Sequence, residues 1–242
     1  MTSSNISSKS SDIITSELSS LLISEGASII GIADIQGINE NPFPDLPVAV
    51  SIGCQLTPTV ISMINHGPTE AYIQEYNRVN QKLLNFADIC IRYIKKEGFR
   101  AVTVEPTPSQ VYLNHLYDTF SHKTAATRAG IGWIGKCALL VTRTWGSAIR
   151  LTTVFSDAPL KIGQPVVQSE CGECTICTNL CPASAPSGKN WNPGLIRDEF
   201  WDANACFLQC EKTQKNRQMS AQVCGICISI CPYTQRFIKD SS

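Results

Sequence analysis

The sequence predicts a mixed α/β (α+β) protein in which helices cover one sheet and a compact cysteine-rich segment follows. Helix-like and strand-like stretches alternate before residue 165, and nine of the 12 cysteines lie between Cys171 and Cys231. Hydrophobic residues make up 43% of the 242 residues, which is enough for a packed core. We place a boundary near Pro165 and expect an α/β domain over 1–164 and a cysteine-rich domain over 165–242.

Apolar periodicity predicts the elements of the first domain. Residues 12–26, 69–97 and 123–129 are expected to be helical, and residues 69–97 repeat apolar positions every three or four residues up to Gly98. Runs with strand character are expected to form the sheet, and they are 27–33, 48–52, 99–104, 137–143 and 149–156. The last two of these runs are expected to form a hairpin across 144–147.

Charge and hydropathy exclude several classes of protein. Lys+Arg and Asp+Glu number 20 each, so a formal net charge of 0 gives no electrostatic reason to expect a nucleic acid or an acidic membrane as partner. No apolar run approaches the ~18 residues of a membrane span, and the serine-rich start lacks the apolar core of a signal peptide. We therefore expect a cytoplasmic protein. Because cytoplasmic proteins rarely form disulfides, the high cysteine count indicates metal binding.

The first cysteine run has the pattern C-x2-C-x2-C-x3-C-P over Cys171, Cys174, Cys177, Cys181 and Pro182. This is the run of bacterial ferredoxins, in which three thiolates hold one 4Fe-4S cluster and the fourth reaches the other cluster. A structural zinc site, the alternative, would more often show two separated C-x2-C pairs.

The second run, from Cys224 to Pro232, has the pattern C-x2-C-x3-C-P and lacks a first cysteine, since Ala221 stands at that position. Two clusters need eight thiolates, so the missing ligand must be Cys206 or Cys210, and we choose Cys206. The crossing rule of ferredoxins assigns Cys171, Cys174, Cys177 and Cys231 to cluster one. It assigns Cys181, Cys224, Cys227 and Cys206 to cluster two.

A glycine-rich stretch, 130–135, matches G-x-G-x-x-G, but a helix is expected before it and a strand after it, the reverse of a dinucleotide site. Gly130, Gly132 and Gly135 would let backbone approach a large flat ligand, and Trp133 would offer a stacking or packing face. The alternative is a connector between helix and sheet. The polar residues around this stretch are candidates to grip an anionic group of a cofactor, unless they form an ordinary charged surface loop. They are His122, Lys123, Thr124, Arg128 and Lys136.

A candidate proton donor, Glu105, ends the strand expected at 99–104 and begins a proline-held turn. Burial would raise its pKa and suit it to general acid catalysis, whereas a solvated glutamate would have no such role. Tyr112 is a second candidate close by in the sequence.

These residues resemble the epoxyqueuosine reductase family and, more broadly, cobalamin-dependent reductases that include the reductive dehalogenases. The resemblance rests on the stretch from Arg128 to Lys136, on Leu139 and Leu140, and on the paired cysteine runs with a lone cysteine between them. It covers roughly residues 13–233. It implies a nitroreductase-like, cobalamin-binding sandwich, with the 130–136 loop at the corrinoid, followed by a ferredoxin-like domain with two 4Fe-4S clusters.

Three departures from the family bear on function. The family places a catalytic aspartate in a V-D-x-x-P segment, where this chain has Glu105. The segment 109–129 is longer and carries His115, Tyr117 and His122. The family continues into a tRNA-binding helical-repeat domain, whereas this chain ends at Ser242 as a short form, so tRNA is not the expected substrate.

The function expected is that of an oxidoreductase that takes electrons from a ferredoxin or flavodoxin and passes them through two clusters to cobalamin and a small-molecule substrate, in an anaerobic setting. Three alternatives stay open. They are an electron-transfer protein that activates another protein's cofactor, a flavin enzyme on the same scaffold, and an epoxyqueuosine reductase that acts on tRNA with a partner.

Overall fold

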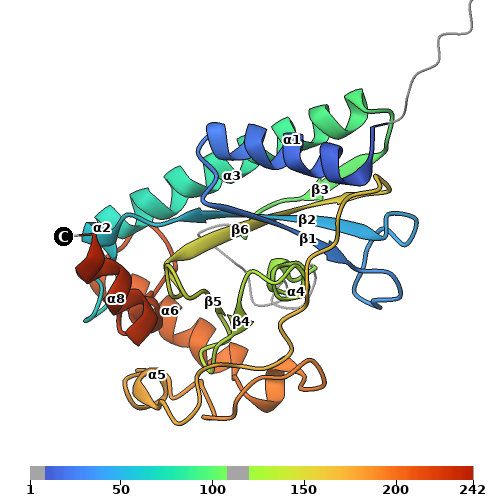
Figure 1. Cartoon of the computed structure of the whole chain (residues 1–242). Coiled ribbons are helices and arrows are strands. Elements are labelled where there is room, and N and C mark those ends of the chain that lie inside the picture. Colours follow the sequence, from blue (N-terminus) through green and yellow to red (C-terminus); the bar gives the residue numbers. More distant parts are fainter. Residues whose placement is uncertain (1–8, 108–119, 242) are drawn as a thin grey trace, which may run out of the picture.

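The computed structural model of the chain describes residues 9–107 and 120–241, which form a sheet between two layers (Figure 1). Helices α1 (Ser11–Ser24) and α3 (Glu70–Lys96) cover one face. Helix α4 (His122–Arg128) lies on the other face, with the cysteine-rich segment beyond it. The mixed helix-and-sheet sandwich predicted from the sequence is confirmed.

The central sheet has four strands in the order β1-β2-β6-β3, and every neighbouring pair is antiparallel. The strands are β1 (Ile29–Asp34), β2 (Val48–Gln55), β3 (Ala101–Val104) and β6 (Ile149–Ser156). The two central strands, β2 and β6, are buried over most of their length because both of their faces are covered.

The hairpin predicted across 144–147 is wrong. Strand β5 (Leu140–Val141) pairs with β4 (Trp133–Ile134) in a separate two-stranded sheet, and a bridge between Thr142 and Gly146 closes the turn that follows. Strand β6 instead pairs along its whole length with β2, and its last four residues, Thr153–Ser156, also pair with β3.

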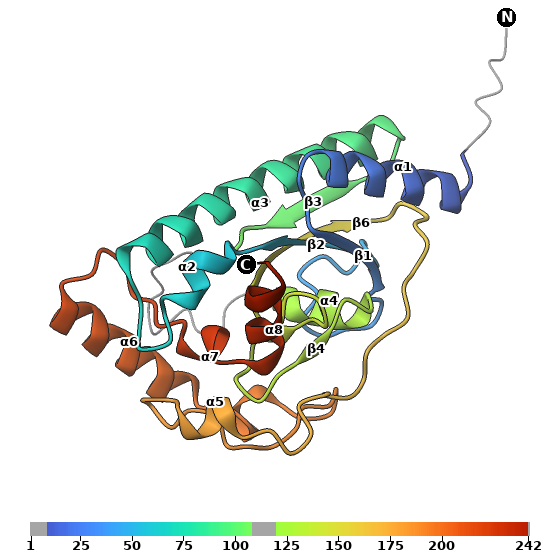
Figure 2. The same cartoon turned by 60° about the vertical axis from the view of Figure 1, so that its left-hand side comes forward.

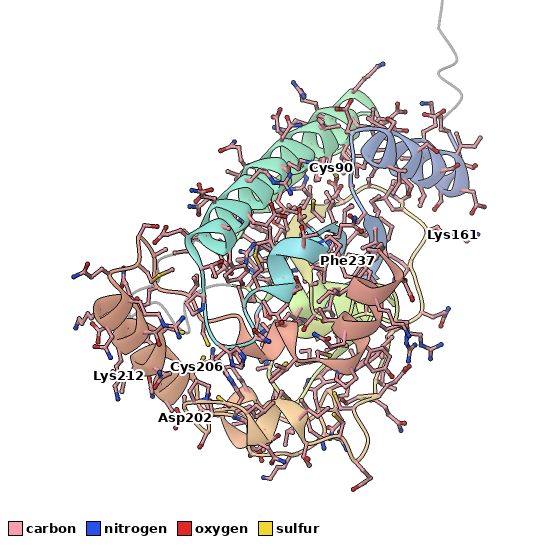
Figure 3. The ribbon with its side chains drawn as sticks, turned by 90° about the vertical axis from the view of Figure 1, so that its left-hand side faces the viewer. Cys90, Lys161, Asp202, Cys206, Lys212 and Phe237 are labelled. Atoms are coloured by element: carbon pink, nitrogen blue, oxygen red, sulfur yellow. The ribbon has the colours of Figure 1, made fainter. Side chains whose placement is uncertain are left out.

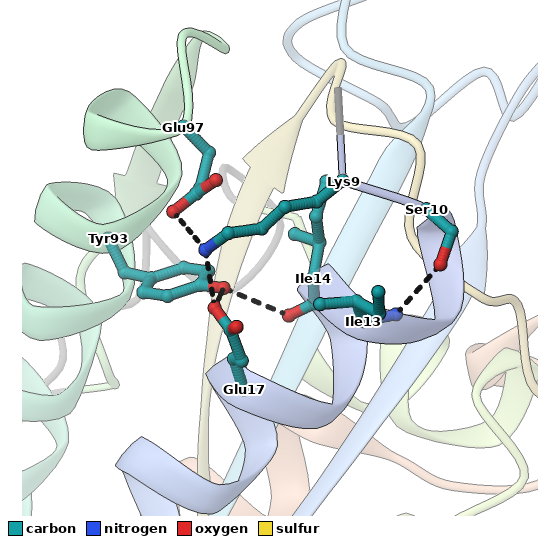
Figure 4. A network of polar contacts seen from close by, with 7 residues as sticks. All are labelled: Lys9, Ser10, Ile13, Ile14, Glu17, Tyr93 and Glu97. Atoms are coloured by element: carbon teal, nitrogen blue, oxygen red, sulfur yellow. Dashed lines mark hydrogen bonds and ion pairs between the residues drawn. The ribbon is translucent and has the colours of Figure 1, made fainter. Parts of the chain in front are cut away.

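The larger core lies between α3 and the sheet. The buried residues of α3 recur with helical spacing, and Val79, Leu83 and Phe86 pack in one cluster with Val50 and Val154 of the sheet. Polar contacts tie α1 to the end of α3: Lys9 Nζ lies 2.6 Å from Glu17 and 2.9 Å from Glu97, and the Tyr93 hydroxyl donates to Glu17 (Figure 4).

Small residues let α4 approach the opposite face of the sheet. A Cβ on Gly31 of β1 would lie 2.8 Å from the Cβ of Ala129, and Ala125 and Ala126 of α4 are fully buried. At its other end α4 begins next to β6, where His122 meets Thr153.

The cysteine-rich segment wraps back onto the first part of the chain (Figure 2). Its helices are α5 (Ile176–Asn179), α6 (Ala203–Arg217), α7 (Ile226–Ser229) and α8 (Pro232–Asp240). Ala221, Val223 and Phe237 belong to the same core cluster as α3, and α8 contacts α2 (Pro58–Ser62). Within residues 9–107 and 120–241, no helix combines the length and apolarity that crossing a membrane requires.

Gly146 gives a test of this docking. It has φ +55°, and a Cβ there would collide with the backbone nitrogen of Thr234 at the start of α8. Thr234 also accepts a hydrogen bond from Ser147 N at 3.0 Å. Gly146→Ala should therefore add an overpacking cost of about 1–3 kcal/mol to the cost of about 1–2 kcal/mol of a left-handed alanine.

Gly98→Ala is the matched control in the urea unfolding measurement, because Gly98 has φ +91° but nothing within 4 Å of its Cβ position. Equal losses of unfolding free energy in the two variants would contradict the docking described for α8.

Candidate functional site

A cavity of about 590 Å³ lies between α4, residues 165–167 and residues 191–200. Three of the predicted cofactor-binding residues line it: Lys123, Thr124 and Arg128. Trp191, Leu195 and Phe200 give the opposite wall an apolar surface. The cavity therefore combines apolar walls with a few polar groups, as ligand sites do.

Lys123 and Arg128 are held at the cavity wall by backbone carbonyls. Lys123 Nζ donates to Ala138 O at 2.7 Å, and Arg128 Nε donates to Asp34 O at 2.5 Å. Burial lowers the pKa of Lys123 to about 8, and the nearby charge of Arg197 acts in the same direction. Both side chains are thus oriented before any ligand arrives.

His122 faces the sheet instead of the cavity. Its Nε2 lies 3.1 Å from Glu105 O, and its Nδ1 lies 2.9 Å from Thr153 Oγ1. A carbonyl can only accept, so Nε2 carries the proton and Thr153 donates to Nδ1. Burial lowers the pKa of His122 to about 4, so the ring is neutral near pH 7, and the structure does not bring it into position as an anion-binding cation.

Two of the three glycines in the 130–135 stretch, Gly130 and Gly132, are packed against the protein's own backbone. A Cβ on Gly130 would lie 2.5 Å from Gln164 O, and one on Gly132 would collide with Val141 O. Trp133 is buried, and its Nε1 has no hydrogen-bond partner among the described residues. The stretch thus acts as a tight connector here, and a corrinoid contact by these glycines and by the buried Lys136 stays a prediction.

The chain around Glu105 is clamped on both sides. His122 binds the carbonyl of Glu105, as described, and three donors converge on the carbonyl of Thr107. They are the Tyr76 hydroxyl at 3.2 Å, Asn80 Nδ2 at 3.0 Å and Arg150 Nη2 at 2.7 Å. Arg150 is held in turn by Asn80 Oδ1 at 2.7 Å and by the Tyr76 ring, 3.4 Å from its centroid.

This clamp fixes the backbone of the candidate acid, but the Glu105 side chain is exposed, so the burial on which the general-acid role was predicted is not found in the structure. Sequence reasoning missed Tyr76, Asn80 and Arg150, because they lie on α3 and β6, far from Glu105 in the sequence. The other candidate acid, Tyr112, lies outside the described residues.

Several of the predicted cluster ligands lie close to one another. Cys231 interacts electrostatically with Cys171 and Cys177, three residues assigned to cluster one. Cys210 is in contact with both Cys206 and Cys224 of the other set. Cys206 lies on α6 (Figure 3), and the choice between Cys206 and Cys210 stays a prediction.

The preference for clusters over a single zinc ion rests on the ferredoxin spacing of the cysteines. Among residues 9–107 and 120–241, no three His, Cys, Asp or Glu side chains form a group that could hold one metal ion. All nine cysteines between 171 and 231 are partly exposed free thiols, as cluster ligands at a domain surface would be.

The charge state of His122 gives a prediction on stability. Because the folded pKa, about 4, lies below the ordinary 6.5, the unfolded chain binds a proton that the native ring does not. The free energy of unfolding should therefore fall by about 1–3 kcal/mol as the pH drops from 6.5 to 4.

His122→Gln should flatten this pH dependence in urea unfolding, while His66→Gln, which removes an exposed ring, should leave it unchanged. A native His122 ring that titrates near pH 6.5 by NMR would contradict the neutral, sheet-facing assignment.

Curated sequences similar to this chain are epoxyqueuosine reductases. The enzyme of Synechocystis is 27% identical over 188 residues, which cover 72% of this chain and 57% of the relative. That of Aliivibrio fischeri is 32% identical over 181 residues, which cover 69% and 44%. The chain thus spans about half the length of these relatives. No protein-family model matches it.

Solved structures share the fold. A catabolic reductive dehalogenase in complex with 3-bromo-4-hydroxybenzoic acid superposes with a TM-score of 0.73 at 16% identity, over 96% of this chain and 33% of that one. An epoxyqueuosine reductase with an epoxyqueuosine-modified tRNA stem loop gives 0.64 at 19% identity, over 92% and 66%. The chain therefore resembles epoxyqueuosine reductases in sequence and shares their fold.

Proposed function

We propose that this chain is an iron–sulfur oxidoreductase that passes electrons from two 4Fe-4S clusters to a corrinoid and thereby reduces a small molecule. The observation that carries the proposal is the position of the cavity. Lys123 lines the cavity and binds the carbonyl of Ala138, the residue that follows Cys137 among the gathered cysteines. A ligand in the cavity would thus lie next to the cluster site.

The clusters and the corrinoid would each supply one part of the reductive chemistry. Thiolates in ferredoxin spacing suit iron–sulfur clusters, which would supply one-electron transfer, while a bound corrinoid would supply a strongly reducing cobalt centre. A one-electron donor such as ferredoxin or flavodoxin would match these clusters. The cysteine-rich segment lies at the surface, where such a protein could dock (Figure 2).

In this proposal the chain's own residues would bind and orient the cofactor and the substrate. Lys123, Thr124 and Arg128 would hold polar groups of the cofactor from α4, and Trp191, Leu195 and Phe200 would exclude water from the opposite wall. Glu105 would donate the proton that accompanies reduction, because its backbone is clamped and a bound substrate would cover its exposed carboxyl group.

A second candidate function is reduction of epoxyqueuosine in tRNA. The sequence similarity to epoxyqueuosine reductases favours it, and one structure with the same fold holds a tRNA stem loop. The expectation against nucleic acid therefore finds no support in the comparisons. If the protein only transferred electrons to another protein, it would bind the two clusters but the cavity would have no role.

Metal analysis tests the proposal directly. The full chain, reconstituted with iron and sulfide without oxygen, should hold about eight irons in its two clusters. It should also bind cobalamin with a change in the visible spectrum, and Lys123→Met should weaken that binding. Eight irons without corrinoid binding would favour the electron carrier, and a yellow, fluorescent denatured extract would favour flavin.

Two substitutions separate an enzyme from a carrier. Glu105→Gln should lower turnover by roughly 10²- to 10⁴-fold in an enzyme that uses it as general acid, and should leave electron transfer to an acceptor dye unchanged. Cys174→Ser should abolish both activities, and Glu25→Gln, at the exposed end of α1, should affect neither.

The substrate assay uses an aryl halide in one arm and an epoxyqueuosine-modified tRNA stem loop in the other. Turnover of the stem loop alone would replace the small-molecule proposal with the second candidate function.

A further inference from the structure

The two halves of the cysteine-rich segment carry opposite charge. Residues 165–202 contain five acidic and two basic residues, whereas residues 203–242 contain two acidic and five basic residues. The first half supplies three of the four cysteines assigned to cluster one, and the second half supplies three of the four assigned to cluster two. A charged partner would therefore distinguish the part of the surface formed by residues 203–242 from the part formed by residues 165–202.

Helix α6, in the basic half, presents a stripe of exposed side chains. Four exposed residues recur every three or four positions, so they share one face of the helix. We call this stripe the α6 face, and its members are Asn204, Leu208, Lys212 and Lys215. Leu208 is 55% exposed although it is a large apolar residue. Figure 3 shows Lys212 on the outer side of α6 and Cys206 on the side toward the rest of the molecule.

The charge of the α6 face is positive and open to solvent. Lys215 Nζ lies 3.1 Å from Glu211 Oε1, but the Lys215 side chain is 71% exposed, and such a pair on a helix surface is weak. The carboxylate of Asp202 caps the start of α6, where it accepts from Ala205 N at 2.9 Å. The rest of the face therefore joins two lysines to an exposed leucine.

Polar contacts at the end of α6 hold this face in place. Arg217 Nη2 donates to His66 O at 2.8 Å, and the Ser220 hydroxyl donates to Glu70 at 2.7 Å. Gln222 Nε2 donates to Phe207 O on the helix itself at 3.2 Å. A partner that binds here would meet an ordered surface and would not have to order it.

We propose that the α6 face is the docking surface for an acidic one-electron donor protein, which passes its electron to the cluster beside α6. The proposal rests on the two-cluster function proposed above. Cys206 and Cys210 both lie on α6, so a donor seated on this face would be one helix away from the predicted ligands of that cluster. One electron leaves the donor and enters the cluster, and no bond forms or breaks.

The composition of the α6 face suits a protein better than a nucleic acid. Each lysine would neutralise only one phosphate, and binding of nucleic acid normally depends on many such contacts. An exposed leucine, in contrast, adds apolar contact to a protein interface, and complementary charge speeds the encounter of transient redox partners.

The test measures how fast a reduced flavodoxin, an acidic one-electron donor, reduces the full chain reconstituted with iron and sulfide. The loss of cluster absorbance is followed by stopped-flow without oxygen at several salt concentrations. The charge reversal Lys212→Glu/Lys215→Glu should lower the second-order rate constant by about tenfold or more at low salt. The difference should disappear near 1 M salt, where charges are screened beyond about 3 Å.

Lys95→Glu/Lys96→Glu is the matched control, because it makes the same change of charge in the last turn of α3, outside the cysteine-rich segment. This variant should be reduced by flavodoxin at the unaltered rate. Dithionite, a small reductant that needs no docking surface, should reduce all three proteins equally fast, and all three should hold about eight irons.

Equal rate constants with flavodoxin for the unaltered protein and the α6 variant at low salt would overturn the docking surface. Equal slowing in the two double variants would overturn it too, because the effect would then follow from net charge alone. If the α6 variant lost only affinity for an epoxyqueuosine-modified tRNA stem loop, the face would bind nucleic acid instead. Fewer than eight irons in the unaltered protein would count against the two-cluster function, so the two failures are distinguishable.

Discussion

The segment from Gly130 to Gly146 packs backbone against backbone, and this constraint fixes where the sheet meets the cysteine-rich segment. Gly130 lies against Gln164, Gly132 against Val141 and Gly146 against Thr234. Each contact leaves no room for a side chain, so these joints are tight and have little freedom to slide. Ile134 of this segment lines the cavity, and Cys137 of the same segment contacts Cys177 and Cys227.

Two different kinds of packing hold the layers around this joint. On the α3 side, large apolar residues such as Phe86 fill the space above the sheet. On the α4 side, Gly31 and the alanines of α4 remove that space, so polar atoms of the two layers come within reach. His122 can meet Thr153 and the carbonyl of Glu105 for this reason. The α4 side therefore carries polar candidate residues beside its smaller hydrophobic clusters, and the α3 side carries the larger core.

The local sequence pattern was enough to predict some of the helices and strands but not how all of the strands pair. The periodic apolar positions of α3 predicted it nearly to its ends, and the helix before the glycine stretch was predicted because α4 carries small apolar residues at its buried positions. The pairing of β5 could not be predicted, since it depends on which strands pair with β6. Likewise, the neutral state of His122 follows from burial under a turn that is remote in sequence. The cysteine spacing can be recognised without knowing the tertiary structure. The candidate cluster ligands were therefore easier to predict from the sequence than the rest of the site.

A chain of direct contacts connects the cavity to the cysteines. Lys123 lines the cavity and donates to Ala138, whose neighbour Cys137 contacts Cys177 and Cys227. The same α4 turn places His122 on the carbonyl of Glu105, so adjacent residues of one helix reach the cluster side and the candidate acid. Both contacts begin on α4, whose C-terminal end packs closely against Gly31 of β1. Under the proposed function, one short helix would therefore contact both the cluster side and the candidate acid.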